Sequence, residues 1–424
     1  MLSYLNIKAA IELIPSGSRI FVHGGAATPN ILLKELVQQS HRLQDCSLIH
    51  LHTEGPAFYA KAEYKDSFRV INLFVGGNIR KNMDYNRIDY LPCFLSEIPE
   101  LFRSKKCLLD VALIHVSPPD VQGYCSLGVS VDIVKSAIQN SKIIIAQINP
   151  NMPRVHGDGF IHSSVFSAAV EVNEKLPQSH PIHLTSEELL IGQHVASLIE
   201  DRSTLQIGIG SIPNAVAQQL LDHKDLGVHS EMWSDGVLNL IESGVITNAY
   251  KKIHRGKSVS GFLIGSQKLY DFVHDNPSVL QFEIDYVNDP NIICRNPRVA
   301  AVNSAVEIDL TGQVCADSIG NRIISGVGGQ MDFMRGAAQS DGGKPIIALQ
   351  SRTKRGRSKI VSQLQPGAGV VTTRSHVHYV VTEYGIAQLH GKTLRDRACA
   401  MIAIAHPEDR ETLEREFAQK FKHD

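Results

Sequence analysis

Two stretches of this 424-residue chain repeat each other in order and in spacing. The segment "GGAATPNILLKEL" at 24–36 aligns with "GIGSIPNAVAQQL" at 208–220. Further on, "HLHTEG" around Glu54 matches "GVHSEM" around Glu231. Each copy predicts a strand, a glycine-rich turn, a helix and a second strand that leads into His-(Thr/Ser)-Glu. Self-similarity of this kind indicates a duplicated structural unit, so we expect two related α/β units.

Short apolar segments recur along the chain, and helical patterns stand between them. The predicted strands are 18–25, 46–55, 68–77, 111–120, 142–150, 204–210, 226–232, 260–266 and 343–350. The helical patterns include 29–39 and 213–223. Near-continuous apolar strands that alternate with helices are typical of mainly parallel sheets covered on both faces. The predicted fold class is therefore α/β.

The chain is longer than a single hydrophobic core usually serves, which favours two domains. Pro177 and Pro181 interrupt local structure, and "TSEE" at 185–188 has the form of a helix-capping box. We therefore predict one domain over 1–180 and a second over 185–424.

Composition narrows the functional classes. A net charge of −1 gives no electrostatic reason to expect nucleic acid or a membrane surface as a partner. No apolar run reaches the length of about eighteen residues expected of a membrane span. The seven scattered cysteines include no CxxC pair and suggest reduced thiols in the cytosol. No metal-ligand spacing stands out, so we predict no metal site and a cytoplasmic protein that acts on small molecules.

Two glycine-rich turns could bind a ligand. In "GIGSIPNAV" (208–216), two glycines and a proline bring backbone N–H groups to a helix N-terminus, which suits an anion. In "SGVGGQMDFMRGA" (325–337), Gly326, Gly328 and Gly329 could let the backbone approach a ligand or expose amides to an oxyanion. A purely steric need for glycine in a tight turn is the alternative for both patterns, and it is favoured for 208–216 when that pattern is taken alone.

Glu231 stands just after a predicted buried strand, where an unpaired carboxylate would be costly. This is the carboxyl edge at which α/β sheets place their ligands. The alternatives for Glu231 are a helix N-cap or a buried salt bridge. Glu54 has an equal claim from the repeat, and spacing alone does not rank the two.

Several long segments stand in the order found in one known family. They are "HGGAATPN" (23–30), "SPPDVQGYCSLGVSVD" (117–132), "GIGSIPNAV" (208–216), "LGVHSEMWSDGVLNLIESGVITN" (226–248), "DYVNDP" (285–290), "GVGGQMDFMRGA" (326–337) and "VVTEYGIAQLHGKTLRDRA" (380–398). Together they resemble the acetyl-CoA hydrolase/transferase family, the branch of class I CoA-transferases that includes 4-hydroxybutyrate and butyryl-CoA:acetate CoA-transferases. The resemblance implies two tandem NagB/CoA-transferase-like α/β domains with mainly parallel sheets.

The resemblance also implies roles for particular residues. Glu231 matches the family's nucleophile, whereas Glu54 does not. Asn288 resembles the asparagine that steadies the catalytic carboxylate. Gly328 and Gly329 correspond to the loop whose amides face the thioester oxygen.

Further residues are implied to bind the substrates. Those that match the CoA-contacting positions are Gly208, Ile209, Gly210 and Gly329. The Gly24-Gly25 turn is implied to assist from the first domain. Ser211 departs from the family pattern, because many relatives carry glycine there.

The implied reaction moves CoA between a short-chain acyl-CoA and a free carboxylate such as acetate. Candidate donors are 4-hydroxybutyryl-, butyryl- and acetyl-CoA. Free glutamate, with a pKa of about 4.3, is ionised at neutral pH and needs no general base to act as a nucleophile. A glutamyl-CoA thioester would give ping-pong kinetics. No tightly bound cofactor is expected beyond CoA thioester as substrate, and relatives suggest a homodimer or larger homo-oligomer.

Three alternatives remain. An acyl-CoA hydrolase would use the same site with water in place of the acceptor acid. A non-catalytic metabolite sensor on this fold would not need the nucleophile. A sugar-phosphate isomerase would need a proton-shuttling acid/base pair instead of an acylable glutamate.

Overall fold

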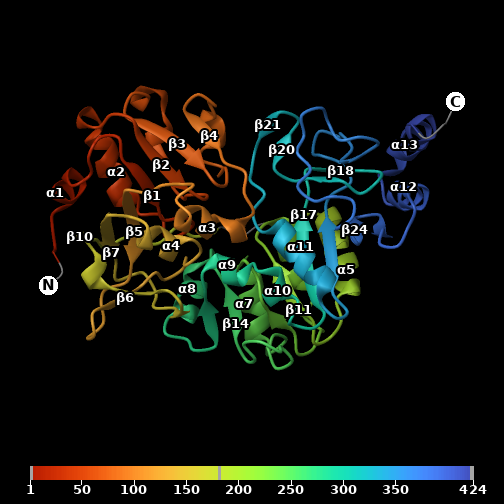
Figure 1. Ribbon diagram of the computed structural model, residues 1–424. Helices are drawn as coiled ribbons and strands as arrows, with labels where there is room; N and C mark the ends of the chain where they lie inside the picture. Colours follow the sequence, from red (N-terminus) through yellow and green to blue (C-terminus); the bar gives the residue numbers. More distant parts are fainter. Residues whose placement is uncertain (1–2, 180–182, 421–424) are drawn as a thin grey trace. The chain divides into compact units, whose positions relative to one another are not determined.

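The computed structural model describes residues 3–179 and 183–420 (Figure 1). Two compact units are present. The first comprises the described part of Met1–His180 together with Val259–Val287 and Ile324–Gly328. The second comprises the described part of Pro181–Ser258 together with Asn288–Ile323 and Gly329–Asp424. Two later segments of the chain therefore fold with the N-terminal unit.

The predicted division between 1–180 and 185–424 stays a prediction, because residues 180–182 at this junction lie outside the described ranges. The capping box just after the junction is confirmed. The Thr185 hydroxyl accepts from the N–H of Glu188, and the Glu188 carboxylate accepts from the N–H of Thr185. Together they begin helix α5 (Ser186–Leu198).

The first unit is built on a seven-stranded sheet in the order β10-β7-β5-β1-β2-β3-β4, with every neighbouring pair parallel. Its strands are β1 (Arg19–Val22), β2 (Cys46–His50), β3 (Phe68–Asn72), β4 (Ile88–Tyr90), β5 (Val111–Val116), β7 (Ile143–Ile148) and β10 (Ala168–Glu171). Its helices are α1 (Ile7–Glu12), α2 (Asn30–Gln38), α3 (Ile98–Arg103), α4 (Val134–Gln139), α8 (Gln267–Val273) and α9 (Ile284–Val287). Every residue of β5 is buried, as expected for a strand covered on both faces.

The second unit is built on a six-stranded sheet in the order β12-β11-β17-β22-β24-β25. The strands are β11 (Thr204–Ile207), β12 (Gly227–Val228), β17 (Val299–Ser304), β22 (Lys344–Ala348), β24 (Tyr379–Thr382) and β25 (Gly385–Gln388). Only β25 is antiparallel to its neighbour. Besides α5, the helices are α6 (Ser211–Gln219), α7 (Asp235–Glu242), α10 (Pro290–Ile293), α11 (Gln330–Gln339), α12 (Leu394–Ala403) and α13 (Pro407–Lys420).

Short strands complete both units. In the first, β6 (Tyr124–Ser126) pairs with β9 (Phe160–His162), and β8 (His156–Gly157) pairs with β16 (Val279–Gln281). In the second, β18 (Glu307–Asp309) pairs with β19 (Val314–Cys315) and β23 (Ile360–Val361). Within the described ranges, no helix is both long enough and apolar enough to cross a bilayer.

The α/β class and the predicted repeat are confirmed by the strand order. The run β2-β1-β5-β7-β10 in the first sheet corresponds to β12-β11-β17-β22-β24 in the second. The patterns did not single out β17 or β24. The segment predicted as a strand at 260–266 lies outside both large sheets, where it forms the two-residue strand β15 (Phe262–Leu263).

Side chains form hydrogen bonds with the backbone groups along the outer edge of the second sheet. The strand there is β12, and Asn248 accepts a hydrogen bond from the Val228 N–H at 2.8 Å. The buried Lys251 ammonium donates to the carbonyls of Val228 and Lys257, both at 2.6 Å. Because exposed edge strands otherwise present unpaired backbone groups, these contacts complete the strand that leads to Glu231.

The protonation of Lys251 should couple to stability. Burial lowers the pKa of its ammonium from 10.5 to about 7. Between these values the unfolded chain binds a proton that the folded chain does not, so the free energy of unfolding rises with pH. From pH 7 to pH 9 this rise should be about 2 kcal/mol larger in the unsubstituted protein than in Lys251→Met. Urea unfolding at both pH values measures it.

The exposed neighbour Lys252 supplies the control. Lys252→Met should keep the pH dependence of the unsubstituted protein. An equal pH dependence in Lys251→Met would contradict the burial argument.

Candidate functional site

Glu231 lies three residues beyond the end of β12, and the 208–210 turn follows β11, its parallel neighbour. Both therefore lie at the carboxyl edge of the six-stranded sheet, as the sequence predicted for Glu231. The fully buried Ser230 fixes the approach to the glutamate. Its hydroxyl lies 3.2 Å from both the N–H and the carbonyl of Ile207 and donates to the Met232 carbonyl at 2.6 Å. The end of β11 thus holds the turn that carries Glu231.

Asn288 contacts the Glu231 carboxylate. Its side-chain amide nitrogen donates to Glu231 Oε2 at 3.1 Å and lies 3.4 Å from Asp332 Oδ2. Asn288 is completely buried, and Asp332 is 4% exposed. A hydrogen bond to a carboxylate is stronger than one between neutral groups, so this amide holds the glutamate in a defined orientation. Asp332 belongs to the first turn of α11, and sequence reasoning had assigned it no role.

Gly329 makes room for this contact. A Cβ atom added there would lie 2.0 Å from Glu231 Oε2 and 2.2 Å from the Asn288 amide nitrogen. Gly329 has a φ of −95°, so its backbone conformation does not require glycine, and the reason for glycine is steric. It is also the N-cap of α11, where the helix dipole favours a nearby negative charge. Glu231, Asn288 and Gly329 are thus brought together.

The turn at Gly208, Ile209 and Gly210 is more open than the surroundings of Gly329. A Cβ atom added at either glycine would meet no heavy atom within 4 Å, and Ile209 is half exposed. Gly210 has a φ of +117°, which side-chain-bearing residues rarely adopt. Helix α6 begins at Ser211, so the serine leaves the turn intact. This backbone is open to a ligand, whereas that of Gly329 is enclosed by side chains.

The remaining predicted site residues belong to the first unit. Gly25 has a φ of +57° and pairs with Thr53, and a Cβ atom at Gly24 would lie 3.1 Å from the His52 carbonyl oxygen. Gly328 has a φ of +58°, and its carbonyl accepts from the N–H of Leu95 at 3.1 Å. Tight turns account for glycine at these positions.

Glu54, the repeat counterpart of Glu231, lies in different surroundings. It is partly buried, and loss of solvent raises the pKa of its carboxyl. Its backbone N–H donates to the Thr28 hydroxyl at 2.9 Å. Within residues 3–179 and 183–420, no hydrogen bond reaches its carboxylate. The two glutamates therefore share a place in the repeat but not a partner.

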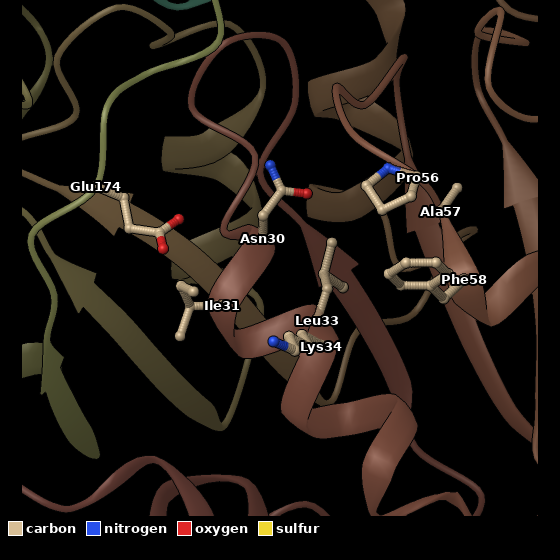
Figure 2. Close-up of a pocket in the computed structure, with 8 residues that line it drawn as sticks. All are labelled: Asn30, Ile31, Leu33, Lys34, Pro56, Ala57, Phe58 and Glu174. Atoms are coloured by element: carbon tan, nitrogen blue, oxygen red, sulfur yellow. The ribbon is translucent and has the colours of Figure 1, made fainter.

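A surface pocket of about 200 Å³ lies between α2 and the turn after β2 (Figure 2). It is lined by Asn30, Ile31, Leu33, Lys34, Pro56, Ala57, Phe58 and Glu174. No predicted site residue lines it. Its volume is below the roughly 300–1,000 Å³ typical of ligand pockets, so we do not assign it as a substrate site.

Sequence comparison matches two family models. Residues 4–181 match the acetyl-CoA hydrolase/transferase N-terminal domain, and residues 265–417 match the C-terminal domain. The chain belongs to the acetyl-CoA hydrolase/transferase family. The resemblance drawn from the motifs is confirmed, and both halves of the family's architecture are present.

Relatives and solved structures of the family cover nearly the whole chain. A succinyl-CoA:acetate/propanoyl-CoA:succinate CoA transferase of Fasciola hepatica is 53% identical over 414 residues, 96% of this chain and 86% of that protein. A 4-hydroxybutyrate coenzyme A transferase of Clostridium kluyveri is 48% identical over 415 residues, 98% of this chain and 97% of that protein. The crystal structure of RipA from Yersinia pestis matches with a TM-score of 0.93 and 33% identity, covering 99% and 97% of the two chains.

Gly329→Ala tests the packing around the glutamate. The added methyl group must displace Glu231 or Asn288, so the free energy of unfolding should fall by about 1–3 kcal/mol. Part of this loss should disappear in Glu231→Ala/Gly329→Ala, since the shortened side chain vacates part of the space. Urea unfolding of the single and double variants measures this coupling.

Gly77 provides a matched control, because a Cβ atom there meets nothing within 4 Å. Gly77→Ala should change stability by less than about 1 kcal/mol and should not couple to Glu231→Ala. Strict additivity of Glu231→Ala and Gly329→Ala would contradict the observed contact.

Proposed function

We propose that this enzyme uses Glu231 as a nucleophile and passes CoA through a glutamyl-CoA thioester. It is an enzyme that transfers CoA, as its similarity to named CoA-transferases over nearly its whole length indicates. The observation that carries the proposal is the Glu231 carboxylate, held by the Asn288 amide beside a glycine with no room for a side chain. The proposed donors are short-chain acyl-CoAs, such as the 4-hydroxybutyryl, butyryl or acetyl thioesters, and the acceptor is a carboxylate such as acetate.

The proposed chemistry proceeds by two exchanges. A Glu231 oxygen attacks the acyl carbonyl carbon, the carbon–sulfur bond breaks, and CoA leaves as the thiolate. The products of this step are the thiolate and a mixed anhydride between Glu231 and the acyl group. The thiolate then attacks the glutamyl carbonyl carbon and releases the acyl group as a free carboxylate. The acceptor acid attacks the resulting thioester by the reverse sequence. The first product, the carboxylate released from the donor, leaves before the acceptor acid reacts, so the kinetics are ping-pong.

Asn288 and Gly329 are proposed to act on the reacting groups. The Asn288 amide orients the carboxylate and can keep its hydrogen bond to that group as the negative charge of the carboxylate is lost on anhydride formation. The backbone amides at Gly328 and Gly329 are proposed to bind the thioester oxygen as negative charge develops there. One such donor typically contributes roughly 3–4 kcal/mol of transition-state stabilisation.

The Gly208-Ile209-Gly210 turn is proposed to contact CoA. Its open backbone and the following helix N-terminus suit the polar, phosphate-bearing cofactor. The Gly24-Gly25 turn is proposed to contribute to the substrate site from the first unit. No tightly bound cofactor or metal is part of the scheme.

Hydrolysis is the main alternative activity, because water could attack the same intermediate. The two relatives described above are named as transferases, which favours an acid as the acceptor. A metabolite sensor would not need the Glu231 carboxylate to be held by Asn288 in this way. We further propose that the enzyme acts in the cytoplasm, since none of its dispersed cysteines, which all lie in the described ranges, forms a disulfide. As the family resemblance suggests, it is proposed to be a homo-oligomer, a homodimer in the simplest case.

Substitutions of the two glutamates test the assignment. Glu231→Ala should lower transfer from acyl-CoA to acetate by at least about 10⁴-fold, because the covalent route is lost. Glu231→Asp should also lose transfer, since the carboxylate retreats by one methylene from the attack distance. Release of free CoA without acetate, measured alongside, separates hydrolysis from transfer.

Glu54→Ala is the matched control from the other copy of the repeat. It should retain transfer within about tenfold of the unsubstituted enzyme. Reversed outcomes for Glu54→Ala and Glu231→Ala would assign the nucleophile to the first unit and overturn the proposal.

A further inference from the structure

A second acidic side chain lies beside the Asn288 amide. Asp332 Oδ2 is 3.4 Å from the Asn288 side-chain nitrogen, which lies 3.1 Å from Glu231 Oε2. Asp332 is 4% exposed and Asn288 is completely buried, so water has little access to the Asn288–Asp332 pair. All three residues belong to the second unit. The amide nitrogen therefore contacts two carboxylates, of which only Glu231 is the proposed nucleophile.

Helix α11 fixes the position of Asp332. Gly329 is the N-cap of this ten-residue helix, so Asp332 is its third residue and lies in the first turn. The backbone N–H groups of a first helical turn have no partner within the helix, and the helix dipole favours a negative charge there. A carboxylate is therefore stabilised at Asp332 despite its burial. Both neighbours, Met331 and Phe333, are buried as well, which limits movement of the turn.

The orientation of the Asn288 amide depends on what its nitrogen contacts. An amide side chain offers two N–H donors on its nitrogen and acceptor lone pairs on its oxygen. The oxygen, Asn288 Oδ1, is buried and has no hydrogen-bond partner among the described residues. A half-turn of the amide would bring this oxygen toward two carboxylates, which repel it, and would remove both N–H donors from them. The two carboxylates therefore hold the amide in the observed orientation.

Only one of the two carboxylates keeps its charge during the proposed reaction. The Glu231 side chain becomes neutral when it forms the mixed anhydride, and it stays neutral as the thioester. Asp332 takes no part in bond formation, so its charge persists throughout. An anionic acceptor binds an N–H group more strongly than a neutral acceptor does. After Glu231 is acylated, the contact with Asp332 is thus the stronger constraint on the Asn288 amide.

We propose that Asp332 is a positioning residue, which keeps the Asn288 amide directed at the glutamyl group while that group is uncharged. This inference rests on the proposed function, because it requires Glu231 to be acylated. When CoA thiolate attacks the glutamyl carbonyl carbon, the sulfur electron pair forms the carbon–sulfur bond and negative charge moves to the carbonyl oxygen. An N–H group held in place stabilises that charge until the carbon–oxygen bond to the acyl group breaks and the acyl carboxylate leaves.

Single-turnover release of the donor acid from labelled acyl-CoA, measured without acceptor, tests this role. Asp332→Asn keeps the size of the side chain but replaces an anionic acceptor with a neutral one, so the rate should fall about tenfold. Asp332→Ala removes the acceptor and should lower the rate about thirtyfold or more. The affinity for free CoA, measured by isothermal titration calorimetry, should stay within about twofold in Asp332→Asn, because Asp332 is not proposed to contact the substrate.

A double-variant comparison separates positioning from a structural role. Asp332 acts through Asn288, so Asp332→Asn should not lower the single-turnover rate further in a chain that already carries Asn288→Ala. The free energy of unfolding in urea should show coupling as well, since each variant alters one side of the same contact. This second measurement involves no catalysis, and circular dichroism checks that each variant is folded.

Asp396→Asn is the matched control, because Asp396 is the third residue of α12 and is exposed. This variant removes the same charge from the same helical position, away from the Asn288 amide. It should keep the single-turnover rate within about twofold, both alone and together with Asn288→Ala.

An unchanged rate in Asp332→Asn would overturn the inference. So would an equal fall of the rate with and without Asn288→Ala, or additive free energies of unfolding, since Asp332 would then act independently of the amide. Failure of the covalent mechanism gives a different result, namely transfer that continues in Glu231→Ala. The coupling in unfolding between Asp332→Asn and Asn288→Ala would still be present in that case, so the two failures are distinguishable.

Discussion

The side-chain amide of Asn288 orients the Glu231 carboxylate, on which the proposed chemistry of this enzyme depends. It lies 3.1 Å from Glu231 Oε2 and 3.4 Å from Asp332 Oδ2, and it is fully buried. Removing a carboxylate from water is costly unless it is hydrogen-bonded, and the neighbouring Asp332 makes that need greater for the partly buried Glu231. Gly329 completes the arrangement by leaving space that any Cβ atom would fill.

The scaffold under this contact explains why the glutamate is well placed. Ser230 fastens the turn before it to the end of β11, while Asn248 and Lys251 complete the backbone pairing of β12. Glu231 is thus carried by a strand whose exposed edge is satisfied from within its own unit. A nucleophile as weak as a carboxylate gains most of its rate from such placement.

The repeat and the strand alternation together predicted much of the fold. Strand order in the two sheets corresponds over five strands, and both predicted glycine-rich turns follow strands or begin helices. Strands β17 and β24 were not among the predicted strands, although each carries a short apolar run. The segment at 260–266 was apolar enough for a strand, but it lies outside both large sheets.

The site was harder to predict, because its members are distant in the chain. Asn288 and Asp332 meet Glu231 only through the fold, and Asp332 shows no signal beyond its place in a helix's first turn. Gly208 and Gly329 look alike in the sequence, yet one is open and the other is enclosed by side chains. The family resemblance, not spacing, ranked Glu231 above Glu54. The carboxylates of the two glutamates differ in their contacts: the Asn288 amide donates to that of Glu231, whereas no hydrogen bond between described residues reaches that of Glu54.

Covalent capture tests the central role of Glu231 most directly. The enzyme is incubated with acyl-CoA and then with borohydride, which reduces an enzyme thioester to an alcohol, and the modified peptide is mapped by mass spectrometry. The proposed mechanism predicts reduction of the side chain at position 231, dependent on acyl-CoA. An enzyme that turns over normally while residue 231 stays unmodified, or that carries the reduced side chain at another residue, would contradict it.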